Sequence, residues 1–221
     1  MEEKNNQKPR PHTYESLAFF GAVTASVSHE LNNVLAIMDQ TTGLLEDRLT
    51  TKSDDIHFPS TKLEKVVNSL QHQAQRGLDL IKRLNRFAHS ADVPELTFEV
   101  NQTLDNLVQL TCRLARLKGA GLEIQPFQEP LNINSNPFIL QQVVFAAIMR
   151  ALQEARKGDI IVVSVNRRDG RVEIEIKGPS TVDSQASIEI GDIRRALEML
   201  SGSLNWEMSD RILTIRVMIP E

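Results

Sequence analysis

A helical pattern near the start of the chain decides the fold, and its central stretch reads Ser28-His29-Glu30-Leu31-Asn32-Asn33. Around it, apolar or small residues recur in alternating steps of three and four, the spacing of a helix that packs along one side. These residues are Leu17, Phe20, Thr24, Val27, Leu31, Val34, Met38, Thr41 and Leu45. His29 falls at heptad position f, opposite this apolar stripe. We therefore predict an exposed imidazole, whose neutral form offers a nucleophilic nitrogen near physiological pH.

Two polar neighbours make His29 a candidate reactive group. Glu30 follows directly and can hydrogen-bond the second ring nitrogen, which would fix the tautomer and the basicity of the ring. Asn33 lies one turn further along the same side of the helix, where its amide can orient a phosphoryl group, a water or a carboxylate. The simpler alternatives are that His29 is an ordinary solvated histidine and that the apolar stripe serves only to form a hydrophobic core.

The run from Phe20 to Ile37 resembles the phospho-acceptor box of two-component sensor histidine kinases, in the subgroup that reads H-E-(I/L)-N-N-P-L. The resemblance implies that His29 carries the phosphoryl group, that Glu30 assists its transfer, and that Asn33 contributes to phosphatase and phosphotransfer chemistry. The chain departs from the subgroup at Val34, where a proline is usual. Losing the proline removes a helix kink, and we expect this to alter the bend of the helix rather than the chemistry.

Composition limits the class of protein. The 221 residues suffice for one large or two small domains, and a hydrophobic content of 41% suffices for real cores. A net charge of -4 without a block of Lys or Arg argues against a nucleic-acid partner. Cys112 is the only cysteine and the five histidines are scattered, so we expect no disulfide, no zinc site and no metal cluster. The lack of a long apolar stretch predicts no membrane partner and a cytoplasmic location.

The first half is predicted to form a helical hairpin. One helix runs from about Tyr14 to Leu49, and the polar connection Thr50–Pro59 ends it. A second helix starts at a capping box, in which Thr61 is followed three residues later by Glu64. Its own apolar stripe consists of Leu63, Val66, Leu70, Ala74, Gly77, Ile81, Leu84 and Ala88. Two helices cover only part of such long stripes, so we expect a symmetric homodimer that forms a four-helix bundle.

The second half is predicted to be an α+β sandwich, with one sheet and helices on a single face. It follows a hinge at Ala91–Leu96 that contains Pro94. Its elements are a helix capped by Asn101 that runs to about Lys118, a strand at Leu122–Gln125, a helix opened by Asn136-Pro137, strands at Ile160–Asn166 and Arg171–Lys177 joined at Asp169-Gly170, a helix at Glu189–Leu200, and a hairpin of Leu204–Met208 and Ile212–Ile219 that turns at Ser209-Asp210. The predicted domains are a flexible terminus at 1–13, a dimerisation and phosphotransfer hairpin at 14–92, and a sandwich at 93–221.

This order resembles the ATP-binding domain that follows the phospho-acceptor bundle in histidine kinases. The stretch Asn136–Ala151 is similar to the asparagine-box helix of that domain, D-x-x-x-L-x-Q-V-L-x-N-L-x-x-N-A, but Ala146 and Arg150 replace both asparagines. In the family the second asparagine holds the magnesium ion that bridges the nucleotide phosphates, which requires an oxygen ligand. Arg150 has no lone pair and cannot hold the ion. It can instead touch phosphate directly or simply face solvent.

Two further nucleotide-binding elements are missing. Where the family has D-x-G-x-G, this chain reads Ile176-Lys177-Gly178-Pro179-Ser180, without the aspartate that accepts the adenine amino group. The segment Thr181–Ser187 is too short for the usual mobile lid, whose glycine run is reduced to Ile190-Gly191-Asp192. Together these losses remove most of what phosphoryl-transfer catalysis needs. We therefore predict a degenerate domain that uses no ATP, no other cofactor and no metal.

An acceptor histidine beside a disabled nucleotide domain predicts a histidine phosphotransfer protein of a two-component phosphorelay. In function it resembles most the bacterial histidine phosphotransferases with a kinase-like fold. Its predicted partners are response-regulator receiver domains, an upstream hybrid histidine kinase and a second copy of the chain. Three alternatives stay open: a divergent but active sensor histidine kinase, a non-catalytic module that sequesters a receiver domain or caps a kinase, and a receiver phosphatase that uses Asn33 to orient water.

Overall fold

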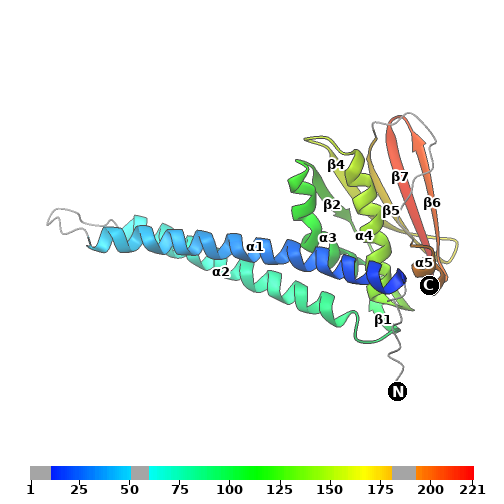
Figure 1. Ribbon diagram of the computed structural model, residues 1–221, viewed down its shortest axis with the longest axis horizontal. Coiled ribbons are helices and arrows are strands. Elements are labelled where there is room, and N and C mark those ends of the chain that lie inside the picture. The colour runs from blue at the N-terminus through cyan, green and yellow to red at the C-terminus, as the bar shows by residue number, and fades with distance from the viewer. Residues whose placement is uncertain (1–10, 51–59, 181–192) are drawn as a thin grey trace, which may run out of the picture.

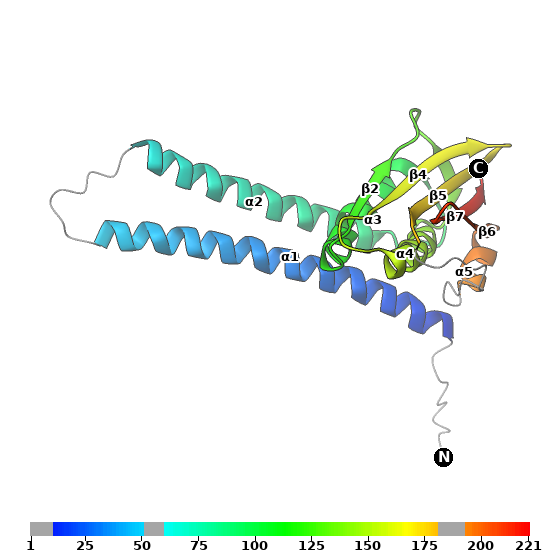
Figure 2. The same cartoon turned by 90° about the horizontal axis from the view of Figure 1, so that it is seen from above.

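The computed structural model describes residues 11–50, 60–180 and 193–221. Two long helices, α1 (Pro11–Thr50) and α2 (Ser60–His89), lie side by side and extend away from a mixed part built on a sheet (Figure 1, Figure 2). The elements of the mixed part are β1 (Leu96–Glu99), α3 (Val100–Leu117), β2 (Gly121–Gln125), β3 (Asn132–Ser135), α4 (Pro137–Glu154), β4 (Ile160–Arg168), β5 (Arg171–Pro179), α5 (Arg194–Met199), β6 (Ser203–Ser209) and β7 (Ile212–Pro220). The predicted fold class, a helical hairpin followed by an α+β sandwich, is confirmed.

Five strands of the mixed part form one sheet. Their order is β2-β4-β5-β7-β6, with β2 and β4 parallel and the other neighbours antiparallel. The helices α3 and α4 pack on one face of this sheet and lie between it and the hairpin, as Figure 2 shows. β1 and β3 pair antiparallel in a separate small sheet that the sequence pattern did not indicate.

Alternating side chains on β5 explain why one face of the sheet carries the helices. Val172, Ile174 and Ile176 are fully buried in the core that the sheet shares with α4. Glu173 and Glu175 point to the opposite face. There Arg216 Nε of β7 donates to Glu175 Oε2 at 2.9 Å. The sheet therefore presents an apolar layer to the helices and a ladder of charged groups on its other side.

Two hairpin turns use left-handed backbone conformations. Asp169 and Gly170, with φ values of 52° and 69°, join β4 to β5, and the predicted turn is confirmed. Asp210 and Arg211, with φ values of 51° and 60°, join β6 to β7. The prediction of a turn at Ser209-Asp210 is wrong by one residue, because Ser209 still pairs with the first residue of β7.

Side-chain caps set the starts of α3 and α4. Asn136 Oδ1 accepts from the Ile139 backbone N–H at 2.9 Å and Pro137 occupies the first turn, as predicted. The predicted Asn101 cap of α3 is wrong. Glu99 caps this helix instead, and its Oε1 accepts from the Asn101 backbone N–H at 3.1 Å. Because β1 runs directly into α3, the last residue of the strand becomes the cap.

Several predicted segments fall outside the described residues. They are the connection after Thr50, the short lid segment Thr181–Ser187 and the remnant Ile190-Gly191-Asp192. The last predicted helix, Glu189–Leu200, is described only from Ile193, and there α5 covers most of it. Of the helices in the described ranges, none combines the length and the apolar composition needed to cross a membrane.

The base of the hairpin packs against α3 and α4, and the buried face of α1 is wider there than the predicted stripe. Val27 and Val34 of that stripe are buried and its other members are half-buried, except Leu17, which is 63% exposed. Phe19, Val23 and Ser26 are buried beside it, and Ser26 Oγ donates to the Leu110 carbonyl of α3 at 3.0 Å. Periodicity thus indicated the buried side of α1, and the contact with the mixed part extends it.

A cluster of phenylalanines joins the two parts of the molecule. The ring centroid of Phe19 lies 5.3 Å from that of Phe87 on α2, 5.3 Å from Phe138 and 5.0 Å from Phe145 on α4. These rings belong to a single hydrophobic core that continues to the inner face of the sheet. The hairpin is thus held against the mixed part at its base, and the residues around His29 keep a defined setting relative to α3.

Candidate functional site

His29 is exposed on α1, which agrees with the prediction. At 3.6 residues per turn its side chain lies about 120° around the helix from Leu17 and about 100° from Glu30. Leu17 is the exposed first member of a stripe that is otherwise buried or half-buried, and Glu30 marks the face turned toward α2 and α3. The imidazole points away from the apolar stripe and is open to a partner.

Glu30 is 7% exposed and lies between three helices. Its Oε2 accepts from Arg76 Nη2 of α2 at 2.5 Å. Two arginines of α3 approach the other oxygen, Oε1, with Arg116 Nη2 at 3.1 Å and Arg113 Nε at 3.9 Å. We call these four residues the Glu30 cluster. A single carboxylate thus ties α1, α2 and α3 together one residue from His29.

The Glu30 cluster replaces the predicted hydrogen bond between Glu30 and His29. Among the described residues, no hydrogen bond joins these two side chains. Consecutive residues of a helix point about 100° apart, and guanidinium groups are stronger, charge-assisted partners for a carboxylate than a neutral imidazole. Glu30 is therefore placed to fix the setting of α1 rather than the tautomer of His29.

Asn33 is exposed and lies at the mouth of a cavity of about 350 Å³. We call it the Asn33 cavity, and it is lined by Glu30, Asn33, Ala36, Ile37, Gln40, Arg76 and Arg116. Asn33 follows His29 by four residues, so the two lie one turn apart on the same side of α1. The structure thus brings Glu30 and Asn33 together at this cavity, whereas His29 is not one of the residues that line it.

The three arginines were not identified from the sequence. Arg76 is separated from Glu30 by 46 residues, and Arg113 and Arg116 lie still further along the chain. The one available signal is that Arg113 and Arg116 share a face of the predicted helix, three residues apart. Nothing in that spacing indicates which carboxylate they meet.

Cys112 and His72 are further candidate nucleophiles close to this site. Both line a second cavity of about 360 Å³ between α2 and α3, together with Glu30 and Arg76. Burial raises the pKa of the Cys112 thiol, and the opposing effect of Arg116 does not cancel this shift. A protonated thiol is a poor nucleophile, so His29 is a better candidate for covalent chemistry than Cys112.

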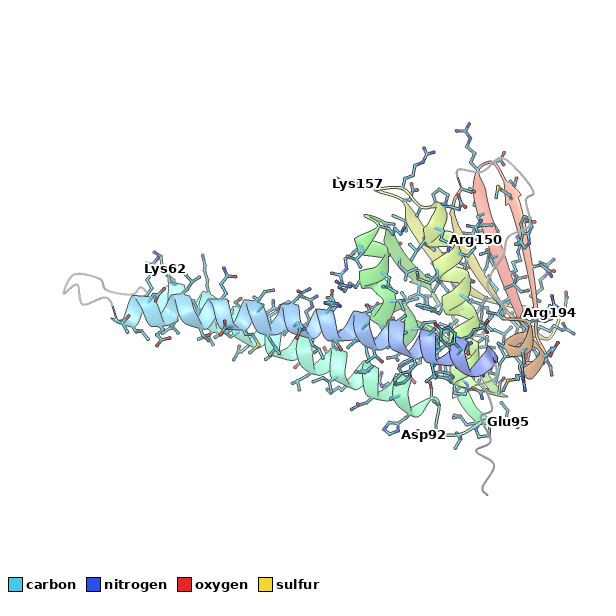
Figure 3. The ribbon with its side chains drawn as sticks, in the orientation of Figure 1. Lys62, Asp92, Glu95, Arg150, Lys157 and Arg194 are labelled. Atoms are coloured by element: carbon cyan, nitrogen blue, oxygen red, sulfur yellow. The ribbon has the colours of Figure 1, made fainter. Side chains whose placement is uncertain are left out.

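The residues at the positions of a nucleotide site do not fit a magnesium–nucleotide complex. Figure 3 shows Arg150 on α4, where its side chain is 15% exposed and its Nη1 donates to Glu154 Oε1 at 2.9 Å. A guanidinium offers no oxygen ligand to a metal ion. Ala146, one turn before it, packs its methyl group against the hydrophobic core. In the part of the chain that the structure describes, no group of three His, Cys, Asp or Glu side chains could hold a metal.

Ile176 on β5 supports the same conclusion for the base. It stands where the D-x-G-x-G pattern has its aspartate, and its side chain is fully buried in the hydrophobic core. An isoleucine provides no carboxylate to accept an adenine amino group.

Comparisons with known proteins bear on the fold. The nucleotide-free catalytic domain of the histidine kinase ThkA matches 58% of this chain and 96% of its own length, with 13% identity and a TM-score of 0.50. The fold is histidine-kinase-like. The histidine kinase AdeS of Acinetobacter baumannii matches 87% of this chain and 97% of its own, with 13% identity and a TM-score of 0.48. ThkA in complex with the response regulator TrrA matches 94% of this chain and 63% of that chain, with 16% identity and a TM-score of 0.48. No protein-family model and no curated protein matches the chain.

Proposed function

We propose that this chain is a histidine phosphotransfer protein of a two-component phosphorelay. It takes a phosphoryl group from the aspartate of one receiver domain, such as that of an upstream hybrid histidine kinase, onto His29 and passes it to the receiver of a response regulator in the cytoplasm. The observation that carries the proposal is the exposed imidazole beside the anchored Glu30, in a chain whose Arg150 and Ile176 do not fit a nucleotide. Such a protein needs only an exposed nucleophile and a docking face.

The transfer forms one bond and breaks one. The unprotonated ring nitrogen of neutral His29 attacks the phosphorus of the aspartyl phosphate and an N–P bond forms. The acyl O–P bond breaks, and its electron pair stays on the leaving aspartate carboxylate. The attacking nitrogen has no proton to lose, and the proton on the other ring nitrogen stays on the ring or passes to water. In this scheme Asn33 orients the phosphoryl group and Glu30 is a positioning residue.

The test identifies which donor, ATP or a phosphorylated receiver domain, supplies the phosphoryl group. Purified protein is incubated with labelled ATP and magnesium alone, and separately with a receiver domain carrying labelled aspartyl phosphate. We expect no label from ATP and rapid label from the receiver, followed by transfer to a second receiver domain. Label from ATP alone would contradict the proposal and make the chain a kinase. No label from any phosphorylated receiver that binds the protein would leave it a binding module.

We also propose that the hairpin forms a homodimer, with the 14–92 region as its dimerisation unit and 93–221 as a degenerate kinase-like domain. On α2, Leu63, Val67, Leu78 and Ile81 are exposed apolar residues at helical spacing. On α1, Leu17 and Leu35 are exposed and lie on one line, five turns apart. A four-helix bundle covers both stripes at once.

Light scattering at micromolar concentration is expected to give twice the chain mass of 24.9 kDa. Leu78→Glu places a charge in the stripe of α2 and should give the monomer mass, whereas Glu64→Gln on the same helix should remain dimeric. A monomer mass for the unchanged protein contradicts the homodimer without affecting the phosphotransfer proposal.

A further inference from the structure

We propose that Arg76 and Arg116 form a binding site for a phosphoryl oxyanion in the Asn33 cavity, next to His29. The inference rests on the proposed function for its role in transfer, but the site itself is a property of the cavity. It assigns the arginines a task beyond holding Glu30: they bind the phosphoryl group while it moves between His29 and a receiver aspartate.

The Glu30 cluster carries more positive than negative charge. Three guanidinium groups, from Arg76, Arg113 and Arg116, face one carboxylate, so the formal charge is +2. Of the described residues, Glu30 is the one carboxylate that lines the Asn33 cavity, and Asp79 lines the neighbouring cavity that Arg76 and Arg116 also reach. The three guanidinium groups are half-buried to exposed, so their remaining positive charge can attract an anion into the Asn33 cavity.

The two arginines retain donors that can reach an anion. A guanidinium has five N–H donors in a planar fork that matches phosphate oxygens, and the contacts to Glu30 use few of them. The side chains of Arg76 and Arg116 are 36% and 57% exposed, whereas that of Glu30 is 9% exposed. The carboxylate thus lies at the bottom of the cluster, and the guanidinium groups remain open to the cavity.

His29 is not itself a lining residue of this cavity, but it lies on the same side of α1 as four residues that are. Asn33, Ala36, Ile37 and Gln40 line it and follow His29 at four, seven, eight and eleven residues, the spacing of a single helix face. The Asn33 amide adds a neutral donor to those of the two arginines. In this proposal a phosphoryl group on His29 turns its oxygens toward these donors.

The chemistry favours such a site during transfer. As the N–P bond forms and the acyl O–P bond breaks, the phosphoryl oxygens carry the negative charge, and fixed guanidinium donors stabilise it. Glu30 holds these donors in place before the phosphoryl group arrives. It also competes with the phosphoryl group for them, so its removal should strengthen oxyanion binding.

The first test uses inorganic phosphate as the probe. Titration into ¹⁵N-labelled full-length protein, read at the arginine Nε–H and Asn33 side-chain resonances, gives the dissociation constant. Arg116→Gln and Arg76→Gln should each weaken binding about tenfold, since each removes a charge-assisted donor. Arg194→Gln is the matched control, since Arg194 lies exposed on α5 (Figure 3), which contributes no residue to the Asn33 cavity. Glu30→Gln should tighten binding.

The second test measures the rate at which phosphoramidate, a small chemical donor, labels His29. Arg116→Gln and Arg76→Gln should slow labelling about tenfold at low donor concentration, with Arg116→Lys between these variants and the unchanged protein because it keeps the charge but not the fork. Circular dichroism confirms that each variant is folded. If Arg194→Gln slows labelling as much as Arg116→Gln does, the inference is overturned, because the labelling rate would then depend only on the overall charge of the protein.

The oxyanion-site proposal and the phosphotransfer proposal can each be contradicted without the other. If phosphate binding depends on Arg76 and Arg116 but no receiver transfers to His29, the oxyanion site stands and the phosphotransfer function is wrong. If a receiver labels His29 at the same rate in Arg116→Gln, and phosphate binding is unchanged, the function stands and the oxyanion site is wrong.

Discussion

Replacing His29 by alanine is expected to abolish transfer from a phosphorylated receiver domain, a loss of at least about 10³-fold in the labelling rate. The nearest other nucleophiles in the described part of the chain are His72 and Cys112, and His72 lies on α2, not on the helix that carries Asn33. Cys112 is half-buried with a raised pKa, and Asn33 has no nucleophilic atom of comparable strength. Because the His29 side chain is exposed, its removal should leave the thermal unfolding of the protein unchanged.

A second exposed histidine provides the control for this variant. His89 lies at the end of α2, where its Nδ1 is 2.7 Å from Asp92 Oδ2. His89→Ala should keep the full labelling rate, and mass spectrometry of the unchanged protein should locate the label on His29. Label that persists in His29→Ala would show that another residue is the acceptor, and the proposed function would have to be given up.

Replacing Phe87 by alanine is expected to lower the free energy of unfolding by about 3–5 kcal/mol. The Phe87 ring is fully buried, and its centroid lies 5.3 Å from that of Phe19, 5.4 Å from Phe20 and 6.0 Å from Phe138. Its loss opens a cavity where the hairpin meets α4, in addition to removing apolar contact. This is a large part of the roughly 5–15 kcal/mol that a domain has in total.

Urea unfolding followed by circular dichroism measures the effect, at a fixed protein concentration because a dimer unfolds with a concentration-dependent midpoint. Leu117→Ala, at an exposed position at the end of α3, is the control and should change the free energy of unfolding by less than about 0.5 kcal/mol. A loss below about 1 kcal/mol in Phe87→Ala would mean that the phenylalanine cluster does not hold the hairpin to the mixed part.

The correct predictions share a local cause. The cap at Asn136 and the turn at Asp169-Gly170 depend on groups within four residues of one another, so their chemistry can be read from a short window. The missed elements depend on distant partners. β1 and β3 have four residues each and exist because they pair with each other, and this pairing also moves the cap of α3 from Asn101 to Glu99.

The same distinction applies to the candidate site. His29, Glu30 and Asn33 were identified from one helical window, and the exposure of His29 follows from its spacing. The roles of Arg76 and Arg116 could not be found in this way, because each reaches Glu30 from a different helix.

The sequence by itself determined the long helices, their order relative to the strands, the exposed histidine and the replacement of residues that a nucleotide would need. Only the tertiary structure decided how far the buried face of α1 extends beyond the predicted stripe, which side chains Glu30 contacts, and that the cluster around Glu30 carries more positive than negative charge. The physical reason is that helix periodicity fixes directions within one element, whereas burial and ion pairing depend on groups that separate elements bring into contact.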